Sequence, residues 1–306
     1  MTSTSSTRGG DAVAVPESGV KTLFPGYFAF VMATGIIAIA ADQHDIHWLA
    51  DVLYVLAVIG YVVLWALLIL RIVLYWRSFL ADLDDHRKGF AFLTVVAGTN
   101  VLGSASVILH GWWTLGWVLW WCSLALWAVL LYSTLFAVIM GSNKPTLGEG
   151  INGTWFLLIV ATQSVVVHGA LHLGQHPDDR LAFGLFAAFC LGIVLYLIVM
   201  TMVFLRWTFS LLDPREVDPP AWIAAGAVAI TVLAGSNLLL DTSGSERLTR
   251  MEPFIEGMTV LAWATATFWF PVMIAIGVWR HLINKVPLRY HPSYWGLVFP
   301  IGMYSV

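Results

Sequence analysis

The sequence predicts an all-α protein that crosses a lipid bilayer many times. Three observations predict this class: hydrophobic residues make up 59% of the chain, charged residues only 11%, and long apolar stretches follow one another. An ordinary soluble domain carries about 25% charged residues. A spanning helix needs about 20 mostly apolar residues, because its backbone polar groups must be paired inside the helix.

Eight stretches meet this length requirement, and a ninth begins near the end of the chain. The expected segments cover residues 24–41, 49–76, 89–110, 112–140, 153–172, 181–209, 219–240, 257–283 and 293–306. We expect a single transmembrane domain over 23–306, truncated in segment 9. Residues 1–22 lack an apolar core and are expected to form a disordered cytoplasmic tail.

Lysine and arginine indicate how the segments are oriented. Twelve of the 15 lie in the N-terminal region or after segments 2, 4, 6 and 8, and three lie in the opposite loops. Because cytoplasmic loops carry the excess of these residues, we expect a multi-pass protein of the cell (inner or plasma) membrane with a cytoplasmic N-terminus. The net charge of −3 is spread over the loops without a basic block, which argues against a nucleic-acid partner.

Odd and even segments differ in composition, which predicts two layers. The even segments are long, rich in Leu, Val, Ile and Trp, and end near a basic residue, as expected of lipid-facing helices. The odd segments contain small and polar residues and are expected to enclose a central path. The candidate lining residues that they supply are Phe28, Thr34, Gly35, Thr99, Asn100, Thr162, Gln163, Ser164 and Thr231.

An aromatic residue near the cytoplasmic end of each odd segment recurs at a nearly constant interval. The residues are Phe28, Phe92, Trp155, Trp222 and Trp295, which are 64, 63, 67 and 73 residues apart. This interval fits a repeated helical hairpin of one inner and one outer helix. Because every hairpin would begin on the same side, the repeats would be parallel and related by an axis along the membrane normal. The alternative is that these aromatics are ordinary interfacial residues.

The polarity of the inner segments indicates what could pass between them. Their cores carry no Asp, Glu, Lys or Arg, which favours fast and weakly selective passage over tight binding of one ion. Inner helices that begin at the cytoplasmic side would point their positive dipole ends there, which favours anions. The same segments offer no carboxylate or Ser/His/Asp arrangement for acid, base or nucleophilic chemistry, so we do not expect an enzyme.

Two strings in the chain resemble a known family of transporters. The first is Phe24-Pro-Gly-Tyr-Phe-Ala-Phe-Val-Met-Ala-Thr-Gly35, and the second is Tyr294-Trp-Gly-Leu-Val-Phe-Pro-Ile-Gly-Met303. Both resemble helices of the tellurite-resistance/dicarboxylate transporter family, which includes plant slow-type anion channels, yeast malate carriers and sulfite exporters. The resemblance covers residues 22–306. It implies ten helices in five hairpins around a pseudo-fivefold pore, a homotrimer, and transport of inorganic anions or C4-dicarboxylates such as malate.

The resemblance also implies a gate residue. Phe299 occupies the place in the Trp-x-x-x-Phe-Pro string where the channel members carry a phenylalanine that plugs the pore. Without the resemblance, it is interpreted as an ordinary lipid-facing or packed phenylalanine. Pro300 would distort the helix beside it and is a further lining candidate. Because the chain stops at Val306 and the tenth helix is missing, we expect that the five-hairpin ring cannot close completely.

Histidines supply the alternative functions. His168 and His172 are four residues apart and would share a helix face. They are expected to be interfacial residues, with a proton-coupling site as the second interpretation and a haem or metal ligand pair as the third. The alternatives to an anion channel are therefore a proton-coupled carrier for malate, sulfite or tellurite and a haem-binding membrane redox protein. We expect no cofactor and no metal.

Small residues on segment 6 form a ridge that another helix could approach closely. Gly184, Ala188 and Gly192 lie four residues apart. Packing within the chain is the first interpretation of this ridge, and a contact between subunits is the second.

Overall fold

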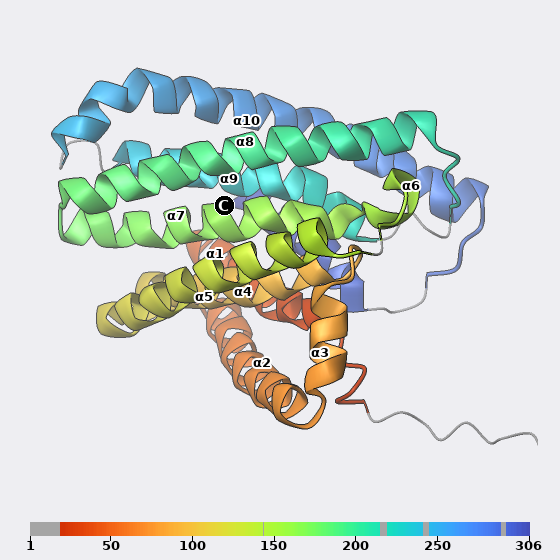
Figure 1. Ribbon diagram of the computed structural model, residues 1–306. Coiled ribbons are helices and arrows are strands. Elements are labelled where there is room, and N and C mark those ends of the chain that lie inside the picture. The colour runs from red at the N-terminus through yellow and green to blue at the C-terminus, as the bar shows by residue number, and fades with distance from the viewer. Residues whose placement is uncertain (1–18, 143, 215–218, 241–244, 289–291) are drawn as a thin grey trace, which may run out of the picture.

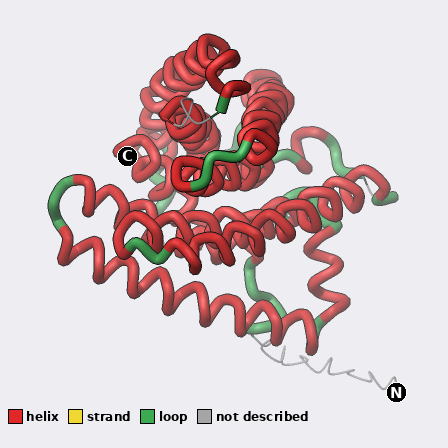
Figure 2. Tube along the Cα trace, turned by 90° about the vertical axis from the view of Figure 1, so that its left-hand side faces the viewer, coloured by secondary structure: helices red, strands yellow, loops and turns green. Residues whose placement is uncertain are grey.

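The computed structural model describes residues 19–142, 144–214, 219–240, 245–288 and 292–306. Within these ranges the chain forms helices joined by loops (Figure 2). Eight of the described helices are long and apolar enough to span a membrane, in agreement with the eight complete segments expected from the sequence. The predicted N-terminal tail falls largely on residues 1–18, which lie outside the described residues.

Five helices form an inner layer, and each follows a short 3₁₀ turn. The helices are α1 (Ala29–Gln43), α4 (Thr94–His110), α7 (Leu157–Gln175), α9 (Ile223–Leu240) and α11 (Trp295–Ser305). The turns are η1 (Pro25–Phe28), η2 (Gly89–Leu93), η3 (Gly153–Phe156), η4 (Pro219–Trp222) and η7 (Pro292–Tyr294). The five repeated aromatics lie in these turns or directly after them, which confirms the hairpin repeat.

The outer layer consists of longer helices that cover the inner ones. They are α2 (His47–Leu74), α5 (Trp113–Met140), α8 (Asp179–Phe209) and α10 (Glu246–Val278), which continues as a π-helical turn over Trp279–Ile283. Between 67% and 89% of each long inner span is buried, against 22% to 33% of each outer span. The two-layer prediction is therefore confirmed, because the outer spans present most of their residues to the surroundings.

The inner helices form a closed ring, contrary to the expectation that the ring would stay open. Each inner helix packs against the next, and α11 packs against α1; the 3₁₀ turns form a matching ring. The closing contact includes the rings of Phe30 and Trp295, whose centroids are 5.0 Å apart. A Cβ on Gly302 would meet the side chain of Ile36, so α11 approaches α1 closely. Closure requires only inner helices, whereas a tenth helix would belong to the outer layer.

The five 3₁₀ turns mark one end of the ring, which we call the 3₁₀ end; the opposite end is the far end. The basic residues that end two outer helices fasten this end. The guanidinium of Arg71, at the end of α2, donates to the carbonyl of Leu23 and pairs with Asp82. Arg206, at the end of α8, donates to the carbonyl of Ile151. Both carbonyls lie two residues before a 3₁₀ turn, so each arginine ties an outer helix to the start of its inner partner.

Two helices at the 3₁₀ end and one helix start differ from the expectation. The short helices α3 (Trp76–Leu83) and α6 (Leu147–Gly150) lie at this end, where loops were expected (Figure 1). Helix α10 begins at Glu246 rather than near residue 257, because the Ser245 hydroxyl accepts a hydrogen bond from the backbone N–H of Leu248 and caps the helix.

Candidate functional site: the centre of the helix ring

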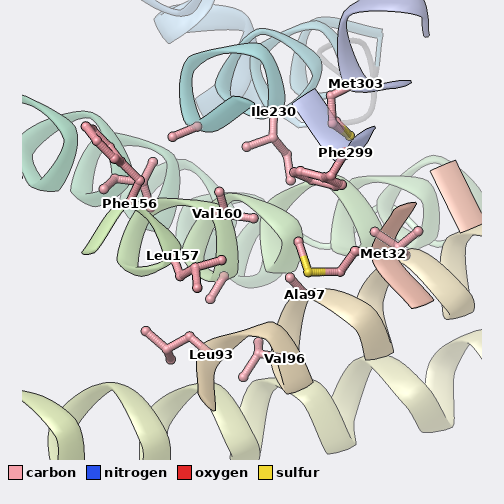
Figure 3. Close-up of a cluster of buried hydrophobic side chains, with 14 of the residues drawn as sticks. Met32, Leu93, Val96, Ala97, Phe156, Leu157, Val160, Ile230, Phe299 and Met303 are labelled. Atoms are coloured by element: carbon pink, nitrogen blue, oxygen red, sulfur yellow. The ribbon is translucent and has the colours of Figure 1, made fainter. Parts of the chain in front are cut away.

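Apolar side chains fill the centre of the ring toward the 3₁₀ end. Figure 3 shows the ring of Phe299 beside Met32 of α1 and Ile230 of α9, with Ala97 of α4 and Val160 of α7 nearby. All five side chains are buried, and Phe299 is 1% exposed. Every inner helix therefore contributes to this cluster, which we call the apolar plug.

A cavity of about 260 Å³ lies on the far side of the plug. All five inner helices contribute to its walls. The lining residues are Ile36, Ile39, Gln43, Asn100, Val101, Ser104, Ile108, Ser164, Val167, Leu171, Ile230, Leu233, Asn237, Met303 and Val306. The cavity is therefore central to the ring rather than a gap between one inner and one outer helix.

The plug and the cavity occupy successive helical turns. In α1 the plug residue Met32 is followed four residues later by the cavity residue Ile36, and in α11 Phe299 is followed by Met303. Ala97 and Val160 stand in the same relation to Val101 and Ser164. Four residues correspond to about one helical turn of 5.4 Å, so the parallel helices stack the cavity directly above the plug.

Neutral polar groups line the cavity among otherwise apolar side chains. Asn100, Ser104, Ser164, Asn237 and Gln43 contribute hydroxyl or amide groups, and no described lining side chain carries a charge. The hydroxyl of Ser104 is buried and has no hydrogen-bond partner among the described residues. A hydroxyl without a partner is free to donate to an anion in the cavity.

Asn100 joins the cavity to the helices behind it. Its Nδ2 donates to Ser164 Oγ at 2.9 Å, and its Oδ1 lies 2.5 Å from Ser123 Oγ on α5 and 3.1 Å from His168 Nδ1. Because an amide oxygen only accepts hydrogen bonds, His168 Nδ1 must carry its proton. The second ring nitrogen, Nε2, then has a free lone pair, and it is buried without a partner among the described residues.

His168 and His172 lie behind the ring, where α7 packs against α4 and α5. Both side chains are fully buried, and their ring centroids are 5.2 Å apart. The His172 ring stacks on Trp117 at 4.1 Å, and a Cβ on Gly103 would collide with the His168 ring. A haem held between histidines would need imidazoles from facing helices, whereas both of these rings come from α7, so the geometry does not favour the haem alternative.

Three of the predicted lining residues face outer helices instead of the cavity. Thr99 Oγ1 is 3.0 Å from the hydroxyl of Tyr61 on α2. Thr162 accepts a hydrogen bond from Trp127 of α5, and Gln163 donates to the carbonyl of Phe189 on α8. These polar groups hold the two layers together in a region where water does not compete for hydrogen bonds.

The remaining candidates lie at helix contacts. The hydroxyls of Thr34 and Thr231 donate to carbonyls of their own helices, and Gly35 lets Val101 of α4 approach closely. Phe28 packs edge-on against Tyr61 and Trp65, and Pro300 packs against Gly226 of α9. Among the predicted residues, Asn100 and Ser164 line the cavity.

Comparison with known families identifies the ring. Residues 22–306 match the sequence model of the voltage-dependent anion channel family. The chain belongs to this family. The match spans the ring, the plug and the cavity, and it confirms the resemblance to the tellurite-resistance/dicarboxylate transporters. Together with the eight apolar helices, this match makes the chain a multi-pass membrane protein of the family.

Relatives of the chain span bacteria, archaea and fungi. An uncharacterized membrane protein of Mycobacterium tuberculosis is 37% identical over 112 residues, which are 37% of this chain and 56% of that protein. An uncharacterized transporter of Methanocaldococcus jannaschii is 24% identical and covers 94% of this chain and 84% of its own length. A sulfite efflux pump of Trichophyton rubrum is 22% identical, with 94% of this chain and 80% of the pump covered. The chain thus spans about half the length of the mycobacterial relative.

Proposed function

We propose that small anions cross the membrane through the centre of the ring, that the cavity holds them in transit, and that Phe299 gates the path. The observation that carries this proposal is the stacked arrangement of plug and cavity at the centre of the five inner helices. An apolar constriction stops ions because it excludes the water that hydrates them. Phe299 supplies the largest side chain of the plug and comes from the helix that closes the ring.

The cavity chemistry favours small anions such as chloride, nitrate and sulfite, and C4-dicarboxylates such as malate are the second substrate class. Hydroxyl and amide N–H groups stabilise negative charge weakly, which permits an anion to enter and to leave again. A doubly charged carboxylate would gain more from an Arg or Lys clamp, and the described cavity lining contains neither. The fungal sulfite pumps among the relatives support an oxyanion such as sulfite as a substrate.

The orientation and the oligomer are part of the proposal. We place the 3₁₀ end in the cytoplasm, because most lysines and arginines lie in the connections at that end. The membrane would be the cell's inner or plasma membrane, and the assembly a homotrimer. The mass of the purified protein in nanodiscs would test the trimer.

A panel of fluxes tests the substrate class. Purified protein in liposomes is given chloride, nitrate, malate, sulfite, tellurite or potassium, and the flux of each is compared with empty liposomes. Selective flux of one or more anions is expected. Flux of potassium at the rate of chloride, or no flux of any anion, would refute anion transport through this protein.

The Ser104→Ala variant tests the cavity as the binding region. The change removes a hydroxyl that has no described partner, so the fold loses no hydrogen bond. The half-saturating anion concentration should rise about three- to tenfold, because a hydrogen bond to the anion is worth about 1 kcal/mol. Ser133→Ala on α5 is the matched control, because that hydroxyl donates to its own helix away from the cavity. Equal shifts in both variants would show that Ser104 does not contact the permeating anion.

Proton coupling is the second candidate function, and one contact favours it. The Asn100 side chain lines the cavity and also lies 3.1 Å from His168, so protonation of the imidazole would change the hydrogen bonds available to an anion. A coupled carrier would accumulate sulfite or malate when a pH gradient is imposed at zero membrane potential, and His168→Gln would abolish this accumulation. If the flux depends on neither the pH gradient nor the substitution, proton coupling is refuted and the channel remains as the proposed function.

A further inference from the structure

A second cavity lies outside the ring. It has a volume of about 710 Å³ and is a groove between the outer helices α5 and α8, with Val165 of the inner helix α7 as its floor. Four tryptophans of α5 form one wall: Trp117, Trp120, Trp121 and Trp127. Small and aliphatic residues of α8 form the other wall: Leu181, Gly184, Leu185, Ala187, Ala188 and Leu191.

The groove walls are apolar although they contain indoles. Trp120 Nε1 donates to the carbonyl of Val165 at 3.0 Å, and Trp127 Nε1 donates to Thr162 at 2.9 Å. The indole N–H groups of these two tryptophans are therefore satisfied by α7, and apolar ring surface remains for the groove. Gly184 lies in the opposite wall, and a Cβ built on it would meet nothing within 4 Å. The first residue of the predicted ridge thus contributes open space rather than a helix contact within the chain.

The length of the groove corresponds to one leaflet of a bilayer. Its walls run from Trp117 to Trp127 on α5 and from Leu181 to Leu191 on α8. Ten residues of helix span about 15 Å, which is half of the roughly 30 Å hydrocarbon core. The groove therefore begins at the far end of the ring and ends near the bilayer midplane, as an acyl chain does.

Opposite charges lie at the mouth of the groove. His176, Asp178 and Arg180 line it there, and all three are exposed. Asp178 Oδ1 accepts hydrogen bonds from the backbone N–H groups of Leu181 and Arg180, which lower the pKa of its carboxyl and keep it negative at neutral pH. No salt bridge of the described chain joins Arg180 to Asp178, although the charge of Arg180 also contributes to the lowered pKa of that carboxyl.

We propose that this groove binds a phospholipid of the far leaflet whose headgroup carries both a phosphate and a primary amine, such as phosphatidylethanolamine. The phosphate would pair with Arg180, the ammonium group would pair with Asp178, and one acyl chain would lie along the tryptophan wall. The charge pair favours this occupant over a second copy of the chain, because a helix face pressed into the groove would bury Arg180 and Asp178 without a matched partner.

Native mass spectrometry of the purified protein, titrated with phosphatidylethanolamine in detergent, tests the proposal without any transport assay. Gly184→Leu should fill the groove and remove the bound lipid, whereas Gly257→Leu should leave it in place. Gly257 is the matched control, because it is also exposed on an outer helix and a Cβ at this position would likewise meet nothing within 4 Å. Arg180→Gln should weaken binding about fivefold, which is the effect of one basic residue near a lipid surface.

Three results would overturn the proposal. One is the same number of bound lipids in the wild-type protein and Gly184→Leu. Another is a change of oligomeric state in Gly184→Leu alone, which would assign the groove to a second copy of the chain. The third is that phosphatidylethanolamine and phosphatidylglycerol bind equally well and that neither Arg180→Gln nor Asp178→Asn changes this binding. The proposed headgroup contacts would then be absent. Arg180→Gln changes an exposed side chain, so the fold does not depend on it.

Discussion

Replacement of Phe299 by alanine should open the path through the ring. The side chain is 1% exposed and stands in the plug, one helical turn below the cavity residue Met303. Removal of the phenyl group leaves only a methyl group at this position of the plug, so water can enter the constriction. If the barrier to anion passage falls by only about 1.4 kcal/mol, the conductance rises about tenfold. We expect at least this increase for Phe299→Ala.

The stability of Phe299→Ala should fall as well, and this effect needs its own control. Loss of a buried phenylalanine costs about 3–5 kcal/mol in soluble cores. Phe189→Ala is matched in chemistry and burial, because Phe189 is 0% exposed, but it lies on α8 near Gly235 and Thr259, away from the plug. Both variants should lower the melting temperature, and only Phe299→Ala should raise the conductance.

A planar bilayer gives the decisive measurement. Single-protein currents in symmetric chloride are recorded for the wild type and for both variants at equal protein density, with folding verified by circular dichroism. An unchanged current in folded Phe299→Ala would refute the gate. An equal rise in Phe189→Ala would refute it too, because a general loosening of the protein would then explain the current.

Two further predictions concern the contacts that hold the ring. Arg206→Met should lower the free energy of unfolding by about 1–3 kcal/mol, because the carbonyl of Ile151 loses its donor. The control Arg77→Met, on the exposed face of α3, should change this free energy little. Thermal melts in detergent compare the two variants, and equal melting temperatures would contradict the fastening role of Arg206. Gly103→Ala should displace the His168 ring, lower the free energy of unfolding by about 1–3 kcal/mol and reduce any flux that depends on a pH gradient. The control Gly277→Ala should leave both quantities unchanged, because its Cβ meets open space. Wild-type stability in Gly103→Ala would show that the His168 ring has room to move.

Hydropathy predicted the spans well because a bilayer imposes a length on every helix. Seven of the eight complete segments have boundaries within three residues of the described helices, and the 89–110 and 219–240 segments agree at both ends. The start of α10 was missed because Glu246, Arg247 and Arg250 lower the hydropathy there, while the local signal was the Ser245 cap. Such a cap depends on one side chain, so a hydropathy value averaged over many residues does not reveal it.

The direction of the polar side chains was harder to predict than their segment. Neighbouring residues on a helix point about 100° apart, so Thr99 and Asn100 cannot both face the ring centre. Asn100 faces the cavity, and Thr99 contacts α2. The pattern that would have found the lining is the four-residue interval from Asn100 to Ser104, which keeps both on one helix face. The groove between α5 and α8 could not be predicted at all, because it depends on how two outer helices diverge.

Ring closure and plug placement are performed by the same helix. Contacts between Trp295 and Phe30, and between Gly302 and Ile36, join α11 to α1, and Phe299 lies between them on α11. In the chain, α11 follows the other four described inner helices and is synthesised after them. Until α11 arrives, the inner helices form an arc that is open to lipid, without an enclosed path. Its arrival seals the arc and adds Phe299, the largest side chain of the plug, in the same event, so no closed ring of these helices lacks Phe299.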